Sequence, residues 1–534
     1  MTSFFNRGVD NTCHKKLSRV ASFCNSRAIM IPFMFITGCT VGPDFTRPDA
    51  PSSMRYSPKP MPELTASAQV AYGEAQRFNT TDDIPFDWWT IFHSPQLNSL
   101  IQRAFKANPS IESAQAALRE AQENAVAQAG FFYPTVGVSY SPSRNKIAGN
   151  MGGNSPGVQG NGDVIQTMSN PTGPTPYNAP VYYNFHVAQI TVGFVPDVFG
   201  LNRRQLESVQ TQVAIQKLQL EATYITLASN VVAAAFQEAS LRAQLESMNR
   251  IVEINRESLE LLRTQLKFGD VSDMDVATQE ASLASAEQVL APLQKQLAQT
   301  RDLIRALAGN LPNEDVEEKF DLASLRLPQE LPLSLPSQIV EQRPDVRAAE
   351  EQLHFASAQT GVAIANTLPQ FAITGAIGGM ADTPAWMFRS GGGFFNLAAN
   401  ISQIIFDGGT LRARSRAAQQ ALLQAGGQYR SVVITALQNV ADTLYTIQAD
   451  ANALKAAAAA TQAAKTVFDI TRQRYQLGSI NYQTQLAAEQ SYQLSVINLI
   501  QAQTNRLGDS AALYQALGGG WWNRTDGMEK NVEY

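Results

Sequence analysis

The side chains best suited to catalysis or metal binding form no recognisable site. The three histidines beyond residue 39, His93, His186 and His354, are far apart and lack the short spacing of metal ligands. Gly391–Gly393 lies in a predicted turn between strands and not in a phosphate-binding loop. We therefore expect neither an enzyme nor a bound metal or cofactor. With a net charge of -5 we also expect no nucleic-acid partner.

Glycine and polar or acidic residues mark two turns, and each turn connects the end of one predicted helix to the start of the next. The first turn has three aspartates near its glycine, and the second has uncharged polar residues. A ring of carboxylates at the mouth of a pore would favour cations. Alternatively, these residues belong to the start of the following helix, with Ser272 or Asp273 as its N-cap. The candidate residues for an aperture or a partner contact are Gly269, Asp270, Asp273, Asp275, Gly478, Asn481 and Thr484.

The stretch from Val187 to Phe268 organises the rest of the sequence. It opens with an alternating pattern in which Ile190, Val192 and Phe194 share one side of a strand. After a turn it continues without a further proline or glycine. Mostly apolar residues recur at every seventh position, and this seam predicts a single very long helix over Leu201–Phe268. The seam comprises Leu206, Val213, Leu220, Leu227, Ala234, Leu241, Met248, Asn255 and Leu262.

The sequence repeats itself once, at two constant offsets. The matches at 235 positions are Pro109 with Pro344 and Pro134 with Pro369, and those at 209 positions are Gly200 with Gly409, Arg203 with Arg412, and Gly269 with Gly478. Two constant offsets separated by one loop-sized step indicate a tandem duplication of helix, strand, loop, strand, long helix, turn and helix.

Each half supplies two strands of about ten residues, the length that a tilted strand needs to cross a bilayer. Four strands cannot close a barrel, and an open edge would leave backbone groups unpaired in hydrocarbon. The chain is therefore expected to oligomerise: two copies would supply eight strands, three twelve and four sixteen. The expected fold class is a mixed α and β membrane protein, with long antiparallel helices continuing four transmembrane strands per chain. The alternatives are a solid coiled-coil rod for the helices and a soluble β-sandwich for the strands.

Residues 1–38 have the composition of a signal peptide, with a basic region followed by a short apolar run. The run is too short to span a membrane. It ends in Ile36-Thr37-Gly38-Cys39, which resembles the lipobox of bacterial lipoproteins. The resemblance implies cleavage before Cys39, lipidation of this cysteine and anchoring through its acyl chains. Because the other two cysteines lie upstream of the cleavage, no disulfide is expected.

The remaining sequence divides by composition and period. Ser94 followed by Pro95 predicts a helix start, and Asn108-Pro109 predicts a break. The predicted segments are a lipidated tether at 39–93, a first repeat at 94–310, a proline-rich connector at 311–336, a second repeat at 337–518 and a C-terminal tail at 519–534. The other predicted strands cover residues 134–140, 371–377 and 397–405, and the predicted exposed loop covers 141–179.

Several motifs keep the same order as in a known family: residues 39–48 (CTVGPDFTRP), Trp88-Trp89, residues 196–204 (PDVFGLNRR), 406–412 (FDGGTLR) and 517–521 (LGGGW). They resemble the outer-membrane factor lipoproteins of tripartite (RND-type) efflux systems, the NodT branch of the outer membrane efflux protein family. The resemblance implies a homotrimer with a 12-stranded barrel in the bacterial outer membrane and a helical tunnel in the periplasm. It also implies contacts with outer-membrane lipid, a periplasmic adaptor and an inner-membrane pump. The connector and the tail would form a belt around the tunnel.

One departure concerns the second turn. Family members often carry aspartates at the helix tips facing the periplasm, but the position expected to be acidic is Ala487 here. The expected function is passive export of small toxic compounds or drugs, with energy from the pump and with adaptor binding selecting the open helix packing at the two tips. The alternatives are the exit duct of a one-step protein secretion system and a lipid-anchored structural coiled coil.

Overall fold

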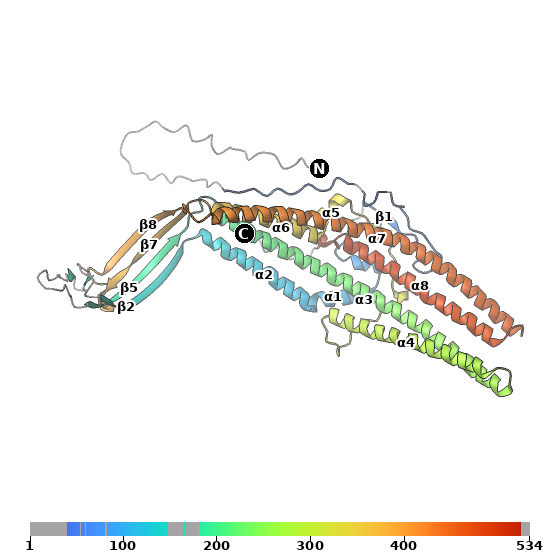
Figure 1. The fold of residues 1–534 in the computed structure, drawn as a ribbon. Coiled ribbons are helices and arrows are strands. Elements are labelled where there is room, and N and C mark those ends of the chain that lie inside the picture. The colour runs from blue at the N-terminus through green and yellow to red at the C-terminus, as the bar shows by residue number, and fades with distance from the viewer. Residues whose placement is uncertain are drawn as a thin grey trace. The chain divides into compact units, whose positions relative to one another are not determined.

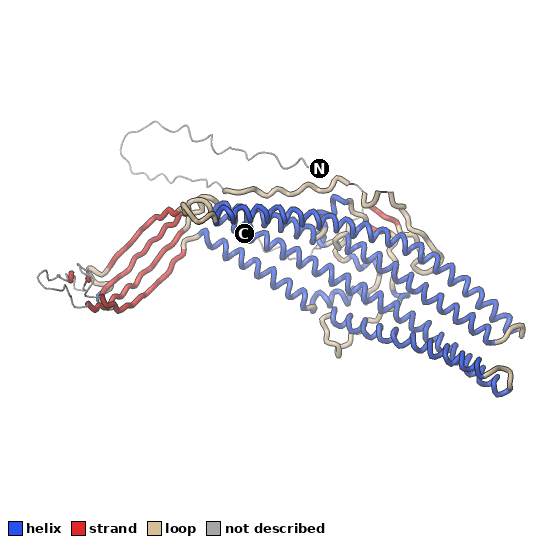
Figure 2. The backbone as a smooth tube through the Cα atoms, in the orientation of Figure 1, coloured by secondary structure: helices blue, strands red, loops and turns tan. Residues whose placement is uncertain are grey.

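The computed structural model describes residues 40–53, 55–58, 60–80, 83–147, 157–158, 164–165 and 181–524. A four-stranded antiparallel sheet continues at one end into a layer of long helices (Figure 1, Figure 2). The predicted signal peptide and Cys39 lie outside the described residues, as does most of the predicted loop at 141–179.

The first repeat has the element order that the sequence predicts. Ser94 caps the first helix by accepting a hydrogen bond from the backbone N–H of Leu97, and Pro95 is its first residue. Helical geometry breaks at Asn108, whose side chain caps the next helix. The elements are α1 (Pro95–Ala107), α2 (Pro109–Ala129), β2 (Thr135–Ile147), β5 (Val181–Phe194), α3 (Leu201–Phe268) and α4 (Asp273–Leu307).

The second repeat reproduces this order. Its long helix has 67 residues, against 68 in α3. Both long helices start after a glycine with left-handed backbone, Gly200 at φ +76° and Gly409 at φ +88°, a conformation that a Cβ would strain. The elements are α6 (Pro344–Ala365), β7 (Gln370–Ala381), β8 (Gly393–Ser402), α7 (Thr410–Gln476) and α8 (Tyr482–Ala516).

The four long strands form one sheet in the order β2-β5-β7-β8, and each neighbouring pair is antiparallel. Val138 pairs with Ile190, Ile190 with Ile377, and Ile377 with Phe395. Because directly paired residues share a face, these four apolar side chains lie in one row across the sheet. The first and the last strand of the row, β2 and β8, are its edges.

The helices next to the sheet follow the same lateral order, α2, α3, α6 and α7. At the other end α4 packs on α3, and α8 packs on both α3 and α7. The heptad seam of α3 is buried from Leu220 to Leu262 and half-buried before it. Its polar member, Asn255, is buried and accepts a hydrogen bond at 3.1 Å from the Gln279 side chain of α4.

Aromatic residues outside the repeats fill the core near the middle of the long helices. Trp88 stacks on Tyr514 at 5.6 Å, and Phe92 meets Phe236 edge to face at 4.9 Å. The described part of the chain also forms several short elements. They are β1 (Arg77–Asn79), η1 (Trp88–Phe92), η2 (Gly130–Phe132), β3 (Gly157–Val158), β4 (Val164–Ile165), η3 (Leu322–Ser324), β6 (Glu330–Pro332), α5 (Pro336–Gln342), η4 (Pro384–Trp386) and η5 (Trp521–Asn523).

Several predicted boundaries are wrong. The strand predicted over 134–140 continues to Ile147, because its polar second half still pairs residue by residue with β5. The strand predicted over 397–405 is β8, which starts at Gly393 and ends at Ser402 because it pairs with β7 only over that span. Within the tether, β1 pairs in parallel with β6 of the connector.

Candidate functional site

The two faces of the sheet differ sharply in polarity. One face carries large exposed apolar side chains, among them Val138 at 82%, Ile377 at 62% and Phe395 at 83% exposure. Near the end remote from the helices, the opposite face carries apolar residues such as Val187, Met380 and Phe394. Nearer the helices its residues are small or polar and uncharged, as register and alternation require. They include Thr135, Gly137, Ser139, Gln189, Thr191, Gly193, Thr374, Ala376, Asn396 and Asn400. An apolar face and an uncharged polar face suit hydrocarbon on one side and a water-filled passage on the other.

The tip between α3 and α4 is a tight turn built around Gly269. Gly269 has φ +80° and donates its N–H to the carbonyl of Leu266. Ser272 caps α4: its hydroxyl accepts from the Asp275 N–H at 3.3 Å and donates to Asp275 Oδ2 at 2.7 Å. Asp275 in turn accepts from the Ser272 N–H at 2.9 Å. These hydrogen bonds from Ser272 lower the pKa of Asp275.

The other two aspartates of this tip have no such role. Within the described part of the chain, neither the Asp270 nor the Asp273 carboxylate makes a hydrogen bond or an ion pair, and both residues are exposed. Asp275 therefore belongs to the helix cap, while Asp270 and Asp273 are the carboxylates available at the tip. Ser272, and not Asp273, is the N-cap residue.

The tip between α7 and α8 uses the same cap geometry with uncharged residues. Gly478 has φ +69°, and the Asn481 side chain accepts hydrogen bonds from the Thr484 N–H at 2.9 Å and the Thr484 hydroxyl at 2.6 Å. Asn481 and Thr484 thus cap α8. Ala487 lies exposed in the next turn, so this tip carries no acid at the expected position. No hydrogen bond or ion pair between described residues joins the two turns themselves.

Polar side chains join the two helical hairpins, α3–α4 and α7–α8. On α3 these side chains lie about three to five helical turns from the tip. Arg250 of α3 donates from Nε to Glu489 Oε1 of α8 at 2.9 Å, and its Nη2 lies 2.8 Å from the same oxygen. Arg250 also contacts Glu253 at 2.8 Å and Glu257 at 3.3 Å on its own helix. The Tyr482 hydroxyl of α8 donates to Glu257 at 3.1 Å. We call Arg250, Glu253, Glu257, Tyr482 and Glu489 the hairpin link.

The electrostatics of the hairpin link favour a fixed, charged arginine. Burial acts to lower the pKa of Arg250, but hydrogen bonds to Glu253 and Glu489 and the nearby carboxylate charges raise it above its ordinary value. Burial and the hydrogen bond to Glu257 raise the pKa of Tyr482. The sequence alone does not predict this link. Arg250, Glu253 and Glu257 share one helix face and were a readable signal, whereas their partner Glu489 is 239 positions away from Arg250.

The start of the tether lies in the groove between α3 and α6. Arg204 of α3 is buried and donates to the Val41 carbonyl at 3.1 Å and to Asp44 at 2.6 Å. Phe45 stacks on His354 of α6 at 4.3 Å, and the same imidazole lies 2.9 Å from Glu207 of α3. These contacts fix residues 41–45 close to the junction of strands and helices.

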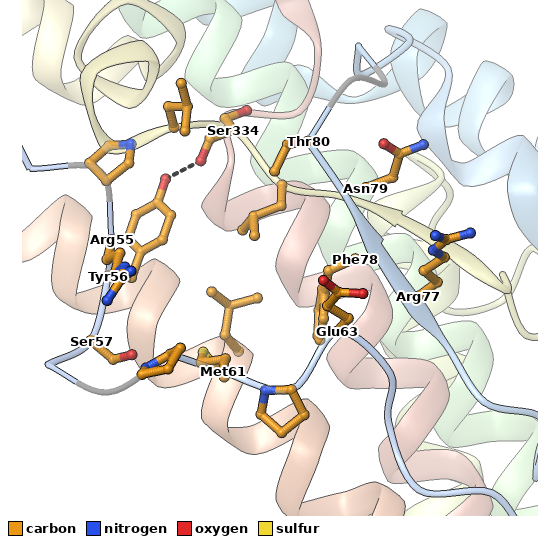
Figure 3. Close-up of a pocket in the computed structure, with 16 residues that line it drawn as sticks. Arg55, Tyr56, Ser57, Met61, Glu63, Arg77, Phe78, Asn79, Thr80 and Ser334 are labelled. Carbon is orange, nitrogen blue, oxygen red and sulfur yellow. Dashed lines mark hydrogen bonds between the residues drawn. The ribbon is translucent and has the colours of Figure 1, made fainter.

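Further along, the tether encloses a cavity of about 570 Å³ between β1, the segment after β6, and α7 (Figure 3). The Tyr56 hydroxyl donates to the Ser334 carbonyl at 2.5 Å, and Met61, Phe78 and Leu444 supply apolar walls. Burial raises the pKa of Tyr56. Most of the lining comes from the tether and the β1–β6 pair, so the cavity belongs to the packing of the tether against α7.

Neither a metal site nor a membrane-spanning helix is found in the described part of the chain. No three His, Cys, Asp or Glu side chains among the described residues are grouped as metal ligands. Among the same residues, no helix is both long and apolar enough to cross a bilayer.

A sheet with one apolar face that continues directly into long antiparallel helices defines the class of outer-membrane channels with a helical extension. The pattern described as "Outer membrane efflux protein" matches residues 100–310 and 335–519, one match for each repeat. The chain belongs to this family, and its members are outer-membrane transport proteins. The fold class expected from the sequence is thereby confirmed for the helices and the four strands of one chain.

Curated relatives cover almost the whole chain. The pyoverdine export outer membrane protein OpmQ of Pseudomonas aeruginosa is 28% identical over 476 residues, which is 88% of this chain and 94% of the relative. The cation efflux system protein CusC of Escherichia coli is 26% identical over 92% of this chain and 98% of the relative. The probable efflux pump outer membrane protein TtgC of Pseudomonas putida is 25% identical over 93% and 96%.

Solved channels have the same fold. The outer-membrane channel OprN superposes with a TM-score of 0.74 at 25% identity, covering 90% of this chain and all of that one. The open state of the MtrE outer membrane channel of Neisseria gonorrhoeae gives 0.73 at 22% identity, covering 90% and 98%.

Proposed function

We propose that this chain is the outer-membrane channel of a tripartite efflux pump, a passive conduit that carries small toxic compounds from the periplasm to the outside. The observation that carries this proposal is the sheet with an apolar face and an uncharged polar face, joined without an intervening domain to helices long enough to form a tunnel. A conduit needs no catalytic group, so the chain is proposed to be no enzyme and to require no cofactor.

The names of the relatives favour small cargo. OpmQ is named for pyoverdine and CusC for cations, and neither name refers to an exported protein. The exit duct of a one-step protein secretion system remains the alternative with the same architecture, and a structural coiled coil is the alternative without a pore. The two-faced sheet argues against the coiled coil, because a rod has no use for it.

Gating is proposed to occur at the periplasmic hairpin tips. In the packing described here, which we propose to be the closed one, the hairpin link holds α8 against α3. Large apolar side chains flank both turns, Phe268 at 78%, Met274 at 74% and Leu477 at 83% exposure. Exposed apolar residues at such positions suit docking of a periplasmic adaptor that is itself joined to an inner-membrane pump. Adaptor binding would select the packing in which the link is broken.

The conduit is proposed to be closed by three copies. One chain leaves β2 and β8 as unpaired edges and α2 and α7 as edge helices. Joining β8 to β2 of the next copy continues the antiparallel order and places α7 beside α2 of that copy. The proposed trimer thus has 12 strands, since each chain supplies four.

The tandem repeat predicts the register of that contact. Within the chain, Glu207 of α3 lies beside His354 of α6, and Ser208 beside Gln359. Adding 209 to a residue number of α3 gives its counterpart in α7, and subtracting 235 from a residue number of α6 gives its counterpart in α2. The two shifts transfer the register of the α3–α6 contact to the contact between α7 and α2 of the next copy. Arg416 then lies level with residues 119–124 of the neighbouring α2.

The charges at this level are of both signs. Arg119 takes the place of His354 and is itself a cation, and two glutamates follow it along α2. Arg416 is exposed and makes no hydrogen bond or ion pair with described residues of its own chain. The segment at 119–124 presents Glu120 and Glu123, both exposed. Glu123 takes the place of Ala358, which is fully buried in the internal contact. We propose that Arg416 pairs with these glutamates across the interface, and we call this contact the copy seam.

The membrane anchor and the segment boundaries follow the same proposal. Residues 1–38 would be removed as a signal peptide and Cys39 lipidated. The path of Thr40, packed against Gly200 at the junction of strands and helices, supports an anchor near the membrane surface. The tether at 39–93, the repeats at 94–310 and 337–518, the connector at 311–336 and the tail at 519–534 are proposed as the functional parts, with connector and tail as a belt.

Planar-bilayer recording of the purified protein tests the conduit. Stable single-channel conductance is expected, and its absence from folded, oligomeric protein would leave the structural coiled coil. A deletion strain exposed to drugs and metal salts, with its secreted proteins compared in parallel, separates the two conduit functions. Sensitisation with an unchanged set of secreted proteins is expected, whereas loss of a secreted protein without sensitisation would favour the secretion duct.

A further inference from the structure

The four long strands have an unusual distribution of charge. None of them contains Asp or Glu, and their only Arg and Lys residues are Arg144 and Lys146. Both residues lie on β2, and both are exposed. They lie near the end of β2 that is remote from the helices, since α2 leads into the other end of the strand. Two cations at one place in strands free of acidic residues form a local anion-attracting patch.

The register places hydrogen-bond donors beside these cations. Arg144 pairs with Asn184 of β5, and Lys146 pairs with Tyr182, whose ring lies 5.2 Å from the Lys146 ammonium. Directly paired residues share a face, so these four side chains belong to one surface. We call Arg144, Lys146, Tyr182 and Asn184 the outer patch.

The outer patch continues the apolar face of the sheet. Val136, Val138 and Tyr140 precede Arg144 on the same side of β2, at alternate positions. At the boundary, the Tyr140 hydroxyl and His186 Nδ1 lie 2.9 Å apart and the two rings are stacked. Along this face, apolar side chains are followed by a hydrogen-bonded aromatic pair and then by cations. This order is expected along a path from the acyl chains to the headgroups of a membrane leaflet.

We propose that the outer patch binds the phosphate of a phosphorylated glycolipid in the outer leaflet of the outer membrane. Arginine matches phosphate geometry with two parallel N–H donors, and lysine adds a point charge. Asn184 supplies an amide donor, and Tyr140 and Tyr182 supply ring faces for the adjoining sugar and acyl parts. The patch offers a phosphate no competing carboxylate from the strands.

The position selects the leaflet. In an outer-membrane channel the helices extend into the periplasm, so the end of β2 remote from them reaches the outer surface. This step depends on the proposed function, because it takes the strands to span the outer membrane. The patch lies within β2 and β5 of one chain, so it does not require the proposed trimer to be complete.

Binding of defined lipids to the purified full-length protein tests the proposal. Wild-type protein, stripped of native lipid in detergent, is titrated with phosphorylated lipid A, dephosphorylated lipid A and phosphatidylglycerol, with native mass spectrometry as the readout. Phosphorylated lipid A is expected to bind, and its affinity is expected to fall about tenfold or more in the Arg144→Ala/Lys146→Ala variant. Dephosphorylated lipid A is expected to bind wild type as weakly as phosphorylated lipid A binds the variant.

Matched variants control for charge and folding. Lys455→Ala/Arg472→Ala removes the same two charges from exposed positions of α7 and is expected to bind like wild type. Arg144→Lys/Lys146→Arg keeps the charges and is expected to retain most of the affinity. Equal binding of phosphorylated lipid A to wild type and the double-alanine variant would overturn the site, and equal binding of phosphatidylglycerol to wild type would overturn the assignment to the glycolipid. Single-channel conductance of the double-alanine variant separates this result from a failure of the conduit function.

Discussion

The long helices α3 and α7 are equivalent in sequence but differ in environment. In α3, 33 of 68 residues are buried, against 10 of 67 in α7. At the offset of 209 positions, Ile225 corresponds to Ile434 and Phe236 to Tyr445. Ile225 and Phe236 are 7% and 2% exposed, whereas Ile434 and Tyr445 are 66% and 51% exposed. The cause is the position of each helix in the layer: α3 has long helices on both sides, and α7 is at the edge.

The exposed apolar residues of α7 indicate that the second repeat packs against a neighbour that one chain does not contain. Arg416, Leu423, Ile434 and Tyr445 follow one another at spacings of 7, 11 and 11, which keeps them on one side of a helix. Ile225 and Phe236 are buried, whereas their counterparts Ile434 and Tyr445 are exposed. This difference is expected when α7 lies at the open edge of an incomplete ring of helices.

Truncation of the two equivalent isoleucines should have different consequences. Ile225→Ala is expected to lower the free energy of unfolding by about 2–4 kcal/mol at every protein concentration, because it leaves a cavity in a packed core. Ile434→Ala is expected to change the dissociated subunit by less than about 0.5 kcal/mol but to weaken assembly. Denaturant unfolding in detergent at several protein concentrations measures both terms. Equal loss at both positions, independent of concentration, would contradict the assignment of α7 as an edge.

Charge reversal across the copy seam should be rescued by a second reversal. Arg416→Glu is expected to raise the dissociation constant of the oligomer about tenfold or more, because it faces Glu120 and Glu123. Glu123→Arg alone is expected to act similarly, and the double exchange should restore much of the assembly. Mass photometry of detergent-solubilised protein provides the measurement, with Arg472→Glu as the control on the same helix. Failure of the double variant to recover would argue against this register.

Breaking the hairpin link should open the periplasmic end. Arg250→Ala is expected to increase single-channel conductance about two-fold or more, since Arg250 makes the ion pair of the hairpin link with Glu489 of α8. Arg256→Ala is a matched control, because Arg256 pairs at 3.3 Å with Glu287 of its own hairpin and both side chains are more than half exposed. An equal response to the two substitutions would show that the link has no special role in closure.

The smallest expected effect concerns a carboxyl pair found only in the second repeat. Asp450 of α7 and Asp509 of α8 take the places of Leu241 and Thr300. Burial and the neighbouring Asp450 raise the pKa of Asp509 to about 8. Between about pH 4 and pH 8 the folded protein therefore holds a proton that the unfolded chain has lost, so the free energy of unfolding falls as pH rises.

Replacement of one member tests this pH dependence. Asp509→Asn is expected to flatten the decline between pH 4 and pH 8 and to raise the melting temperature at pH 8 by about 2 °C or more. Circular dichroism melts across this range provide the measurement. Asp302→Asn is the control, because Asp302 is an exposed carboxylate of α4 paired with Arg305 at 2.6 Å. An unchanged slope in Asp509→Asn would rule out this pair as its source.

The sequence predicted the elements well where periodicity or capping chemistry was local. The long helix over Leu201–Phe268, the helix start at Ser94 and the break at Asn108 are confirmed, because each depends on residues within a few turns. Strand ends were predicted poorly. The second half of β2 is polar, and β8 starts with a glycine, so neither carries the alternation that marks a strand.

The candidate site divides in the same way. The sequence located both tips, and the caps by Ser272 and Asn481 follow from residues three positions away. It did not reveal that the Asp275 carboxylate bonds back to Ser272 as part of the cap, or that Glu489 pairs with Arg250. The first depends on the direction of a side chain at a turn, and the second on two helices from different repeats packing together.

By itself the sequence determined the duplication, the periods of its helices and strands, and the polarity of each strand face, because these depend on residues adjacent along the chain. Only the tertiary structure decided which copy of a repeated side chain is buried and which charges meet. Two repeat-related helices of almost equal length acquire different environments when one has neighbours on both sides and the other lies at an edge. Burial and charge pairing are properties of the neighbour as much as of the residue.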